Sequence, residues 1–247
     1  MIQKSIFFIT LCTSFFSLKS FAQGDPKITE IWKPEAPIVT PGKTAADAPS
    51  DAIVLFKGKN LDAWQSEKGG GMASWTIADN AMTVKPGSGG IKTKQAFGSC
   101  QMHIEWRAPE VVKGEGQGRG NSGIFLMEQY ELQVLDMYKN KTYSNGQAGS
   151  MYKQTIPLAN ASRKPGEWQT YDILFTAPEF YEDGRVKSAA RITVLHNGVL
   201  IQNNTSIWGG TQYIGIAKYE KHASALPIML QDHGDLVSFR NIWIRNL

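Results

Sequence analysis

Apolar and polar residues alternate along most of the chain after residue 50. In the segment "YELQVLDMY", Leu132 and Val134 fall on one face, and Glu131 and Gln133 fall on the other. A period of two is typical of a β-strand with one face on a core. The second face here carries a carboxylate and a carboxamide instead of a mixture of lysine and threonine. It is a candidate floor of a site.

The same alternation recurs in short segments separated by turn residues, and no stretch longer than about ten residues has a helical period. Asn197-Gly198 predicts a two-residue hairpin turn, and Asp79-Asn80 predicts a weaker one. This pattern predicts an all-β fold, a large sandwich of two antiparallel sheets. The expected strands are Ile53–Phe56, Trp75–Ala78, Ala81–Val84, Gln101–Arg107, Ser122–Met127, Tyr130–Asp136, Trp168–Thr176, Ala190–His196, Val199–Gln202, Tyr213–Ala217, Ile228–Asp232 and Val237–Arg245.

Several expected strands carry Glu, Gln, His or Arg on the face away from the core. Glu105 and Arg107 share such a face, as do Gln231 and His233. In the last strand, Asn241 is expected on the same face as Phe239. In a curved sandwich, polar faces can converge in a groove that binds a polar ligand. The alternative for each of these residues is an ordinary solvent-facing position.

These faces give a set of candidate site residues, with Glu131 at the centre. Glu131 or Asp136 is the candidate base, and His233 is a candidate metal ligand or electrophile. The glycines of "GRGNSG" let the backbone approach a sugar closely. The candidate substrate-binding residues are Glu105, Arg107, Arg119, Asn121, Ser122, Gln133, Lys153, Gln154 and Gln231.

The spacing of Glu131, Gln133 and Asp136 is similar to the Glu-x-Asp-x-x-Glu motif of laminarinase-type retaining β-glucanases. In that motif a β-bulge keeps all three acids on one face. A bulge here would bring Asp136 beside Glu131. Because Gln133 replaces the middle acid, the pattern disfavours a conventional endo-glycanase.

The N-terminus has the pattern of an export signal. Met1–Ala22 combines Lys4, an apolar run and small residues near its end, which predicts a signal peptide and a periplasmic or secreted protein with no transmembrane segment. Residues 23–50 are rich in proline and predict an extended arm before a domain at 51–247. Removal of Lys4 and Lys19 lowers the formal net charge from +4 to about +2. That charge, without a basic cluster, disfavours nucleic acid as a partner.

Longer segments resemble the 3-keto-disaccharide hydrolase family, formerly domain of unknown function 1080. The resemblance covers about Ala52–Leu247 and rests on "GNSGIFL", "YELQVLDMY", "RITVLHNGV", "PIMLQDHGDLVSFRNIWIRNL" and the long stretch from "NGQAGSMY" to "TAPEF". The resemblance implies a concanavalin A-like jelly-roll fold. It also implies an enzyme that cleaves glycosides oxidised at C3, with an oligosaccharide or glycoside as the substrate. Dependence on a divalent metal ion is also implied.

A 3-keto group acidifies the C2 proton, so a base can start elimination of the group at C1, after which water adds. His233 with Glu131 and Glu105 is the predicted metal set, suited to Mn, Zn, Co or Ca; a groove without an ion is the alternative. The alternative function is a non-catalytic carbohydrate-binding module, for which Trp64, Trp75 and Trp208 offer aromatic surface.

Overall fold

The computed structural model describes residues 25–247, which form two compact units divided between Ile38 and Val39. In the first unit, the 3-10 turn η1 (Pro26–Thr29) is capped by the side chain of Asp25. Among the described residues, every strand lies in the second unit, Val39–Leu247. The predicted signal peptide lies outside the described residues.

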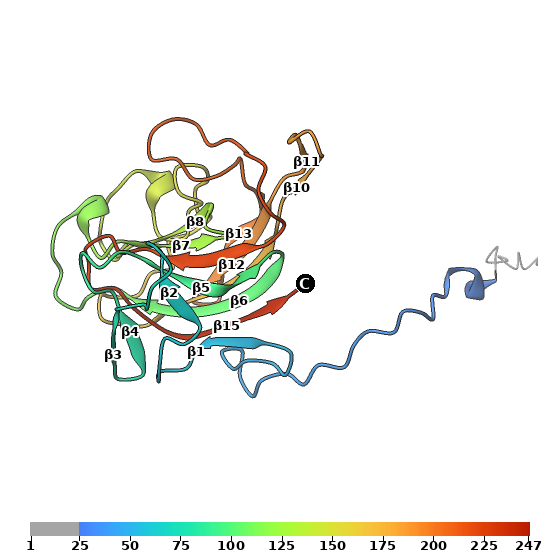
Figure 1. The fold of residues 1–247 in the computed structure, drawn as a ribbon, viewed down its shortest axis with the longest axis horizontal. Helices are drawn as coiled ribbons and strands as arrows, with labels where there is room; N and C mark the ends of the chain where they lie inside the picture. The colour runs from blue at the N-terminus through green and yellow to red at the C-terminus, as the bar shows by residue number, and fades with distance from the viewer. Residues whose placement is uncertain (1–24) are drawn as a thin grey trace, which may run out of the picture. The chain divides into compact units, whose positions relative to one another are not determined.

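The second unit is built on two antiparallel sheets (Figure 1), which confirms the predicted all-β, concanavalin A-like jelly-roll sandwich. The larger sheet has the order β13 (Val199–Ser206), β12 (Arg191–His196), β9 (Gln169–Thr176), β6 (Cys100–Arg107), β15 (Ser238–Asn246), β4 (Ala81–Thr83) and β3 (Thr76–Ala78), with β1 (Ile53–Phe56) also paired to β15. The smaller sheet has the order β2 (Trp64–Ser66), β5 (Ile91–Phe97), β14 (Leu226–Leu230), β7 (Ser122–Leu126) and β8 (Tyr130–Val134). A separate ribbon pairs β10 (Glu179–Phe180) with β11 (Val186–Ser188).

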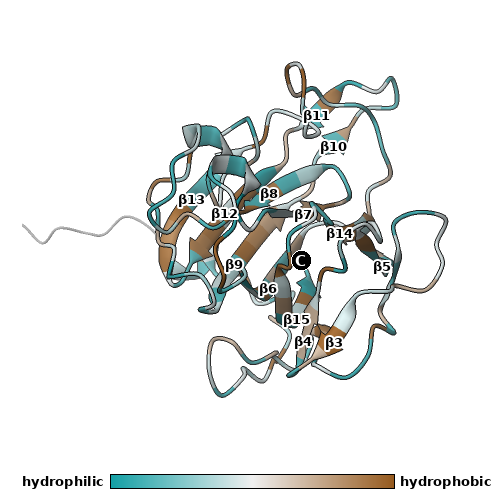
Figure 2. Cartoon of the chain, turned by 90° about the vertical axis from the view of Figure 1, so that its left-hand side faces the viewer, coloured by the Kyte–Doolittle hydropathy of each residue, from teal (hydrophilic) through white to brown (hydrophobic). Residues whose placement is uncertain are grey.

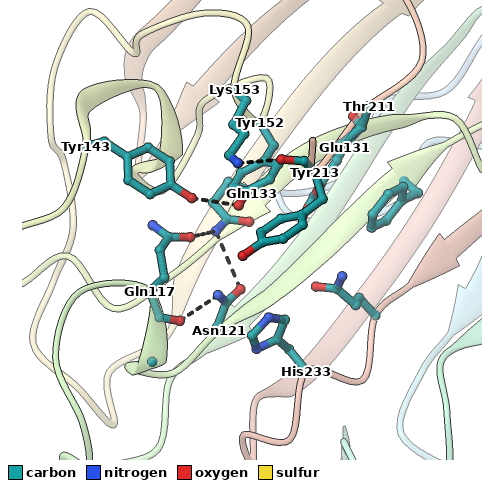
Figure 3. A pocket seen from close by; sticks show the side chains of 13 residues that line it. Gln117, Asn121, Glu131, Gln133, Tyr143, Tyr152, Lys153, Thr211, Tyr213 and His233 are labelled. Carbon is teal, nitrogen blue, oxygen red and sulfur yellow. Dashed lines mark hydrogen bonds between the residues drawn. The ribbon is translucent and has the colours of Figure 1, made fainter. Parts of the chain in front are cut away.

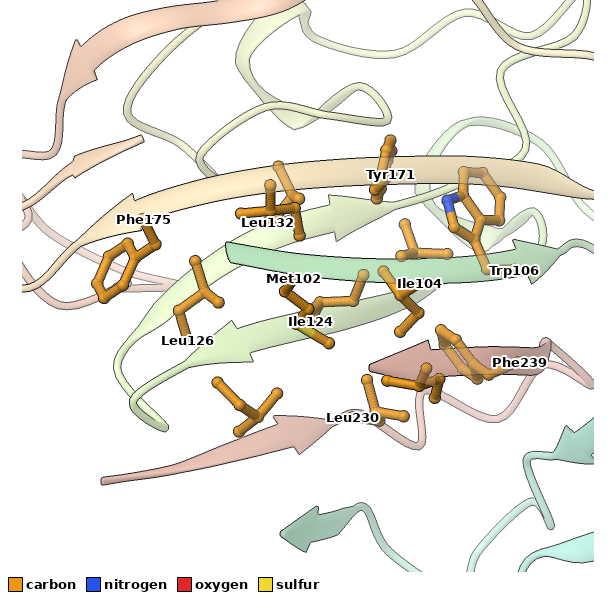
Figure 4. Packing of buried hydrophobic residues seen from close by; sticks show 14 of the residues in the cluster. Met102, Ile104, Trp106, Ile124, Leu126, Leu132, Tyr171, Phe175, Leu230 and Phe239 are labelled. Atoms are coloured by element: carbon orange, nitrogen blue, oxygen red, sulfur yellow. The ribbon is translucent and has the colours of Figure 1, made fainter. Parts of the chain in front are cut away.

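The core lies between the inward faces of the two sheets. Strand β6 contributes Met102, Ile104 and Trp106, and β8 contributes Leu132 and Val134, all at most 1% exposed. Figure 4 shows these strands packing against apolar side chains of β7, β9, β14 and β15. Colouring by hydropathy shows brown, apolar residues on the strands, and β8 also carries teal, polar residues (Figure 2). The alternation seen in the sequence is therefore the division between core and outer faces.

Both predicted hairpin turns are present. Asn197 and Gly198 have positive φ angles of 52° and 81° and join β12 to β13. Asp79 and Asn80, at 51° and 59°, join β3 to β4 in the same way. A two-residue turn of this type requires positive φ at both central positions, which Asn, Asp and Gly tolerate best.

Some expected elements differ from the structure. The segment Tyr213–Ala217 is a loop, not a strand, and its side chains of Tyr213 and Ile214 are 73% and 83% exposed. Strands β2, β5, β10 and β11 were not among the expected segments. Strand β5 has only Ile91, Thr93 and Phe97 buried, with polar residues between them, so its alternation is weak.

The expected faces of the last strand are wrong after Arg240. The register between β15 and β6 shifts between Arg240 and Trp243, and Asn241 has a φ of 46°. This β-bulge turns Asn241 away from the core, so that Ile242 and Ile244, both fully buried, take the inward positions.

Two of the tryptophans offered as a sugar platform belong to the interior. Trp64 is 1% exposed and Trp75 is 4% exposed, and their indole nitrogens donate to backbone carbonyls of Leu55 and Gly89. Trp208 is 56% exposed. No helix within residues 25–247 has the length and apolar character needed to cross a membrane.

Candidate active site

A pocket of about 680 Å³ lies over the smaller sheet, on the face opposite the core. That volume suits a mono- or disaccharide-sized ligand. Its floor comes from β7, β8 and the end of β14, and its walls come from the segment before β7 and from the loops that follow β8 and β13. The lining residues are Gln117, Gly118, Asn121, Phe125, Glu131, Gln133, Tyr143, Tyr152, Lys153, Thr211, Tyr213, Gln231 and His233 (Figure 3).

Strand β8 holds Glu131 and Gln133 rigidly because both of its edges are bonded. On one edge it pairs with β7 in a regular register, with Phe125 opposite Glu131. On the other edge the Tyr152 amide donates to Glu131 O at 3.0 Å, and the Gln133 amide donates to Ser150 O at 3.0 Å. The chain segment 149–152 thus adds to β8 and brings the following residue, Lys153, to the pocket.

Gly123 provides the space for the Glu131 side chain. It lies opposite Gln133 on β7, and a Cβ atom there would fall 2.7 Å from Glu131 Oε1 and 2.9 Å from the Phe125 ring. The third glycine of the "GRGNSG" segment is therefore required by close packing against the carboxyl group.

Glu131 is the main electrostatic feature of the pocket. Glu131 is only 4% exposed, and this burial raises the pKa of its carboxyl group from 4.5 to about 8. A low-dielectric environment disfavours the charged carboxylate, so the acid is mostly protonated at neutral pH. A carboxyl group whose pKa lies near working pH can both accept and release a proton during turnover.

Gln133 and its neighbours form an amide network beside Glu131. Gln133 Nε2 donates to Gln117 Oε1 at 3.1 Å, and Asn121 Nδ2 donates to Gln117 O at 2.7 Å. With the Gln133 amide turned over, its nitrogen lies 3.1 Å from Glu131 Oε1. The two orientations let this amide accept from a protonated Glu131 or donate to an ionised one.

The far wall is aromatic and carries a lysine. The hydroxyls of Tyr143 and Tyr152 lie 2.6 Å apart and share a hydrogen bond. Lys153 Nζ donates to Tyr213 O at 2.5 Å. Figure 3 shows Lys153 and His233 at opposite ends of the pocket.

Six of the predicted site residues meet in this pocket. Glu131 and Gln133 come from β8, Asn121 precedes β7, Lys153 follows the segment beside β8, and Gln231 and His233 follow β14. Of these, Asn121, Glu131 and Gln133 are at most 4% exposed, whereas His233 is exposed at the edge.

Asp136 and Arg119 lie together, but in a neighbouring cavity of about 540 Å³. Arg119 Nε donates to Asp136 Oδ2 at 2.7 Å, and Arg119 Nη2 donates to Tyr138 O at 2.9 Å. The pairing of β7 with β8 has no bulge, and β8 ends at Val134. The bulge considered from the sequence is therefore absent, and Asp136 does not join Glu131.

Glu105 and Arg107 lie on the outer face of the larger sheet, away from the pocket. Glu105 accepts from Arg240 Nε at 2.6 Å and from Asn241 Nδ2 at 2.9 Å. The Arg107 guanidinium stacks on Trp168 at 4.7 Å. A sandwich has two outer faces, so strands with similar polar patterns need not share a groove. The prediction that the polar faces of β6 and β8 converge in one site is therefore wrong.

Ser122 and Gln154 have internal hydrogen-bond partners. Ser122 Oγ donates to Gln231 O at 2.7 Å, which ties β7 to the end of β14. Gln154 Nε2 donates to Gly209 O at 3.0 Å, and its Oε1 accepts from the Trp208 amide at 2.8 Å. Both side chains hold elements that border the pocket.

Five polar lining residues were not predicted from the sequence. They come from loops, whose path across the sheet no periodic pattern reveals: Gln117, Tyr143, Tyr152, Thr211 and Tyr213. The one available signal was the tyrosine content of "TYSNGQAGSMYK", which lies close to the predicted Lys153.

The predicted metal set is divided by the fold. Glu131 and His233 line the pocket, whereas Glu105 is bonded on the other sheet. Within residues 25–247, no group of three or more His, Cys, Asp or Glu side chains is placed to hold an ion. The donor set therefore does not fit a protein-held metal, and the metal requirement stays a prediction. Chelation followed by dialysis tests it: loss of turnover supports the requirement and unchanged turnover contradicts it.

Comparison with known proteins gives a consistent family. The family described as 3-keto-alpha-glucoside-1,2-lyase-like domain matches residues 51–245. A 3-keto-disaccharide hydrolase from Bacteroides thetaiotaomicron is 26% identical over an alignment 243 positions long, which covers 79% of this chain and 78% of that protein.

Solved structures agree with this result. A candidate glycosyl hydrolase from Parabacteroides distasonis has 54% sequence identity and a TM-score of 0.87, covering 92% of this chain and 98% of that one. A second one from the same organism shares the fold, with a TM-score of 0.56, 20% identity and coverage of 79% and 94%. The names of these relatives point to a glycoside hydrolase-like protein, and the chain belongs to the 3-keto-alpha-glucoside-1,2-lyase-like family.

Proposed function

We propose that this protein is an exported enzyme that cleaves the glycosidic bond of 3-keto-glycosides by elimination, followed by hydration. One observation carries the proposal. Among the described residues that line the pocket, Glu131 alone has a carboxyl group, and its pKa is raised to about 8. A conventional glycosidase needs two carboxyl groups that flank the scissile bond. Elimination next to a ketone needs only one.

In this reaction Glu131 removes the proton from C2, and the electron pair of the C2–H bond moves onto the C3 oxygen as an enolate. The enolate then collapses, the C1–O bond breaks, and the departing oxygen takes a proton. His233, which lines the edge of the pocket, is the proposed donor of that proton. Water adds across the C1–C2 double bond of the enone, which completes net hydrolysis. Gln133 and Asn121 offer hydrogen bonds to sugar hydroxyls.

The alternative, a carbohydrate-binding module, retains support from the aromatic side chains Tyr143 and Tyr213 at the rim. One experiment separates the functions. The purified protein is offered p-nitrophenyl glucoside, its 3-keto derivative and a glycan affinity gel. Turnover of the keto compound alone supports the proposal. Retention on the gel without turnover supports the binding module, and turnover of the unmodified glucoside supports an ordinary glycosidase.

Export is tested separately. Cleavage after Ala22 would leave Gln23 as the first residue of the mature chain. The N-terminal mass of the protein from a native periplasmic or culture fraction checks this, and an intact Met1 would contradict it.

A further inference from the structure

The pocket has a single fixed positive charge. Among the described lining residues, Lys153 alone is a permanent cation. The elimination proposed above forms a negative oxygen at C3, and a preorganised cation at that point would lower the barrier. The chain offers no cluster of metal ligands within residues 25–247 to do this.

Lys153 is held by its surroundings in an unfavourable backbone conformation. Its φ is 58°, which a lysine rarely adopts, and its amide donates to Asn145 O at 2.7 Å. Its ammonium group lies 4.4 Å from the ring centre of Tyr213, 5.7 Å from that of Tyr152 and 5.9 Å from that of Tyr143. Three aromatic faces and one carbonyl therefore fix the position of this charge at the pocket wall.

Lys153 does not form an ion pair with Glu131, the carboxyl group of the same pocket. Within the described part of the chain, no ion pair of 4.0 Å or less joins Lys153 to Glu131, and burial is the cause of the raised Glu131 pKa. Both side chains line the same pocket, whose volume of about 680 Å³ leaves room for a ligand. The adjacent Tyr143–Tyr152 pair uses only one of its two hydroxyl hydrogens internally, so it retains one hydrogen for a ligand oxygen.

We propose that Lys153 is a catalytic residue that binds the C3 carbonyl oxygen of the substrate and stabilises the enolate, with the Tyr143–Tyr152 pair as a second donor. This inference rests on the proposed elimination. As Glu131 takes the C2 proton, the electron pair shifts to the C3 oxygen, and the ammonium group of Lys153 faces the growing charge. The ammonium keeps its proton throughout. When the C3 carbonyl re-forms and the C1–O bond breaks, the interaction weakens again.

The test compares Lys153→Met with Lys139→Met on two substrates, the p-nitrophenyl and methyl 3-keto-glucosides. Lys139 is a matched control because it also has a positive φ, 52°, and lies 5.7 Å from the Tyr138 ring, but it does not line the pocket. We expect Lys153→Met to lower kcat by about 10²-fold or more on both substrates with little change in KM. Lys139→Met should leave both constants unchanged, and Lys153→Arg should recover at least part of the loss. Melting curves check folding, and Lys153→Gln replaces the Met variant if that one unfolds.

Three results would overturn the assignment while leaving the proposed function intact. Turnover within threefold of wild type would show that the charge is not needed. A higher KM with unchanged kcat would show that Lys153 only binds the ground state. A much larger loss on the methyl compound than on the nitrophenyl compound would make Lys153 the acid for the leaving group. Absence of turnover by the wild-type protein would instead reject the proposed function and this inference together.

Discussion

Glu131 is mostly protonated at neutral pH in the free protein, because burial raises its pKa to about 8. The Gln133 amide can stabilise both the protonated and the ionised carboxyl group, because its oxygen or its nitrogen, depending on how the amide is turned, lies 3.1 Å from Glu131 Oε1. As a base, a carboxylate with this pKa is stronger than an exposed one. At the scale of the residue, the site thus depends on one carboxyl group whose proton is lost near working pH.

This pKa predicts the pH dependence of the reaction. If Glu131 is the base, its ionised form is active, so kcat/KM should rise with pH and level off above about 8. The measurement is kcat/KM from pH 5 to 10 for the p-nitrophenyl 3-keto-glucoside, whose leaving group departs as an anion and needs no proton from His233. A value that falls as pH rises through 8 would make Glu131 an acid and contradict the proposed role.

Glu131→Gln should separate catalysis from stability. The substitution is nearly isosteric, and we expect kcat to fall by about 10²-fold or more. In the wild type, the unfolded chain loses the proton near 4.5 while the folded chain keeps it to about 8. The free energy of unfolding therefore falls as pH rises through this window, and the variant avoids that loss.

The corresponding measurement is the difference in Tm between Glu131→Gln and wild type at pH 5 and pH 9. It should shift in favour of the variant at pH 9. A variant with normal turnover would refute the catalytic role. A collapse in stability at both pH values with normal activity per folded molecule would show that Glu131 is structural.

At the scale of elements, the pairing of β7 with β8 decides whether Glu131 reaches the pocket. The chain needs a residue without a Cβ opposite Gln133, and Gly123 meets that need with an ordinary negative φ. Space, not backbone freedom, is the constraint at this position.

Gly123→Ala should therefore displace the Glu131 carboxyl group. The new methyl would fall 2.7 Å from Glu131 Oε1, so we expect kcat to drop by at least about tenfold, with a loss of stability of about 1–3 kcal/mol from overpacking. Steady-state kinetics and denaturant unfolding measure the two effects. Unchanged kcat would show that the carboxyl position is not critical.

The bulge in β15 has a separate structural task. Asn241 Nδ2 donates to Glu105 Oε1 and to Ala46 O, each at 2.9 Å, and so joins the segment before β1 to the outer face of the larger sheet. Asn241→Ala removes both bonds and places alanine at a φ of 46°. We expect it to lower the free energy of unfolding by about 1–3 kcal/mol, with kcat unchanged because the pocket is on the other sheet. Asn241→Gly, which relieves the backbone strain, should lose less. Reduced kcat in the folded Ala variant would contradict this division.

At the scale of the whole molecule, four buried titratable groups set the pH range of stability. Burial lowers the pKa of His103, but the hydrogen bond to Asp172 and the nearby Glu105 carboxylate outweigh it and raise the pKa to about 9. Burial raises the pKa of Glu105, but His103, Asn241 and Arg240 together lower it to about 2. Glu131 and His196 are the other two, and burial lowers the pKa of His196 from 6.5 to about 3. The four groups oppose each other across the pH scale.

The directions of these pKa shifts predict that the protein is most stable on the acid side of neutrality. The His103 contribution is complete below 6.5 and is lost as pH rises through about 9. The Glu131 contribution falls between 4.5 and about 8, and the Glu105 contribution is lost as pH falls through about 2. The His196 contribution rises between about 3 and 6.5, so it offsets the Glu131 loss between 4.5 and 6.5. Tm measured from pH 3 to 10 should therefore peak between roughly 4.5 and 6.5. A maximum above pH 8 would show that these groups do not dominate.

The sequence by itself determined the strands with a buried face, because a period of two records which side chains meet the core. It also determined the two hairpin turns, since Asn197-Gly198 and Asp79-Asn80 favour positive φ. The polar face that carries Glu131 and Gln133 could be predicted for the same reason. These properties are local, and they depend on neighbours along the chain.

Only the tertiary structure decided which polar faces share a site. Strands β6 and β8 have similar patterns, but sheet order places Glu105 and Glu131 on different sheets. The bulge at Asn241 reverses the faces within one strand without any change of composition. The loops that bring Tyr143, Tyr152 and Tyr213 around Lys153 have no apolar–polar periodicity from which their path could be predicted. Contacts between distant segments arise from how the sheets pack, and that information is not carried by the spacing of residues.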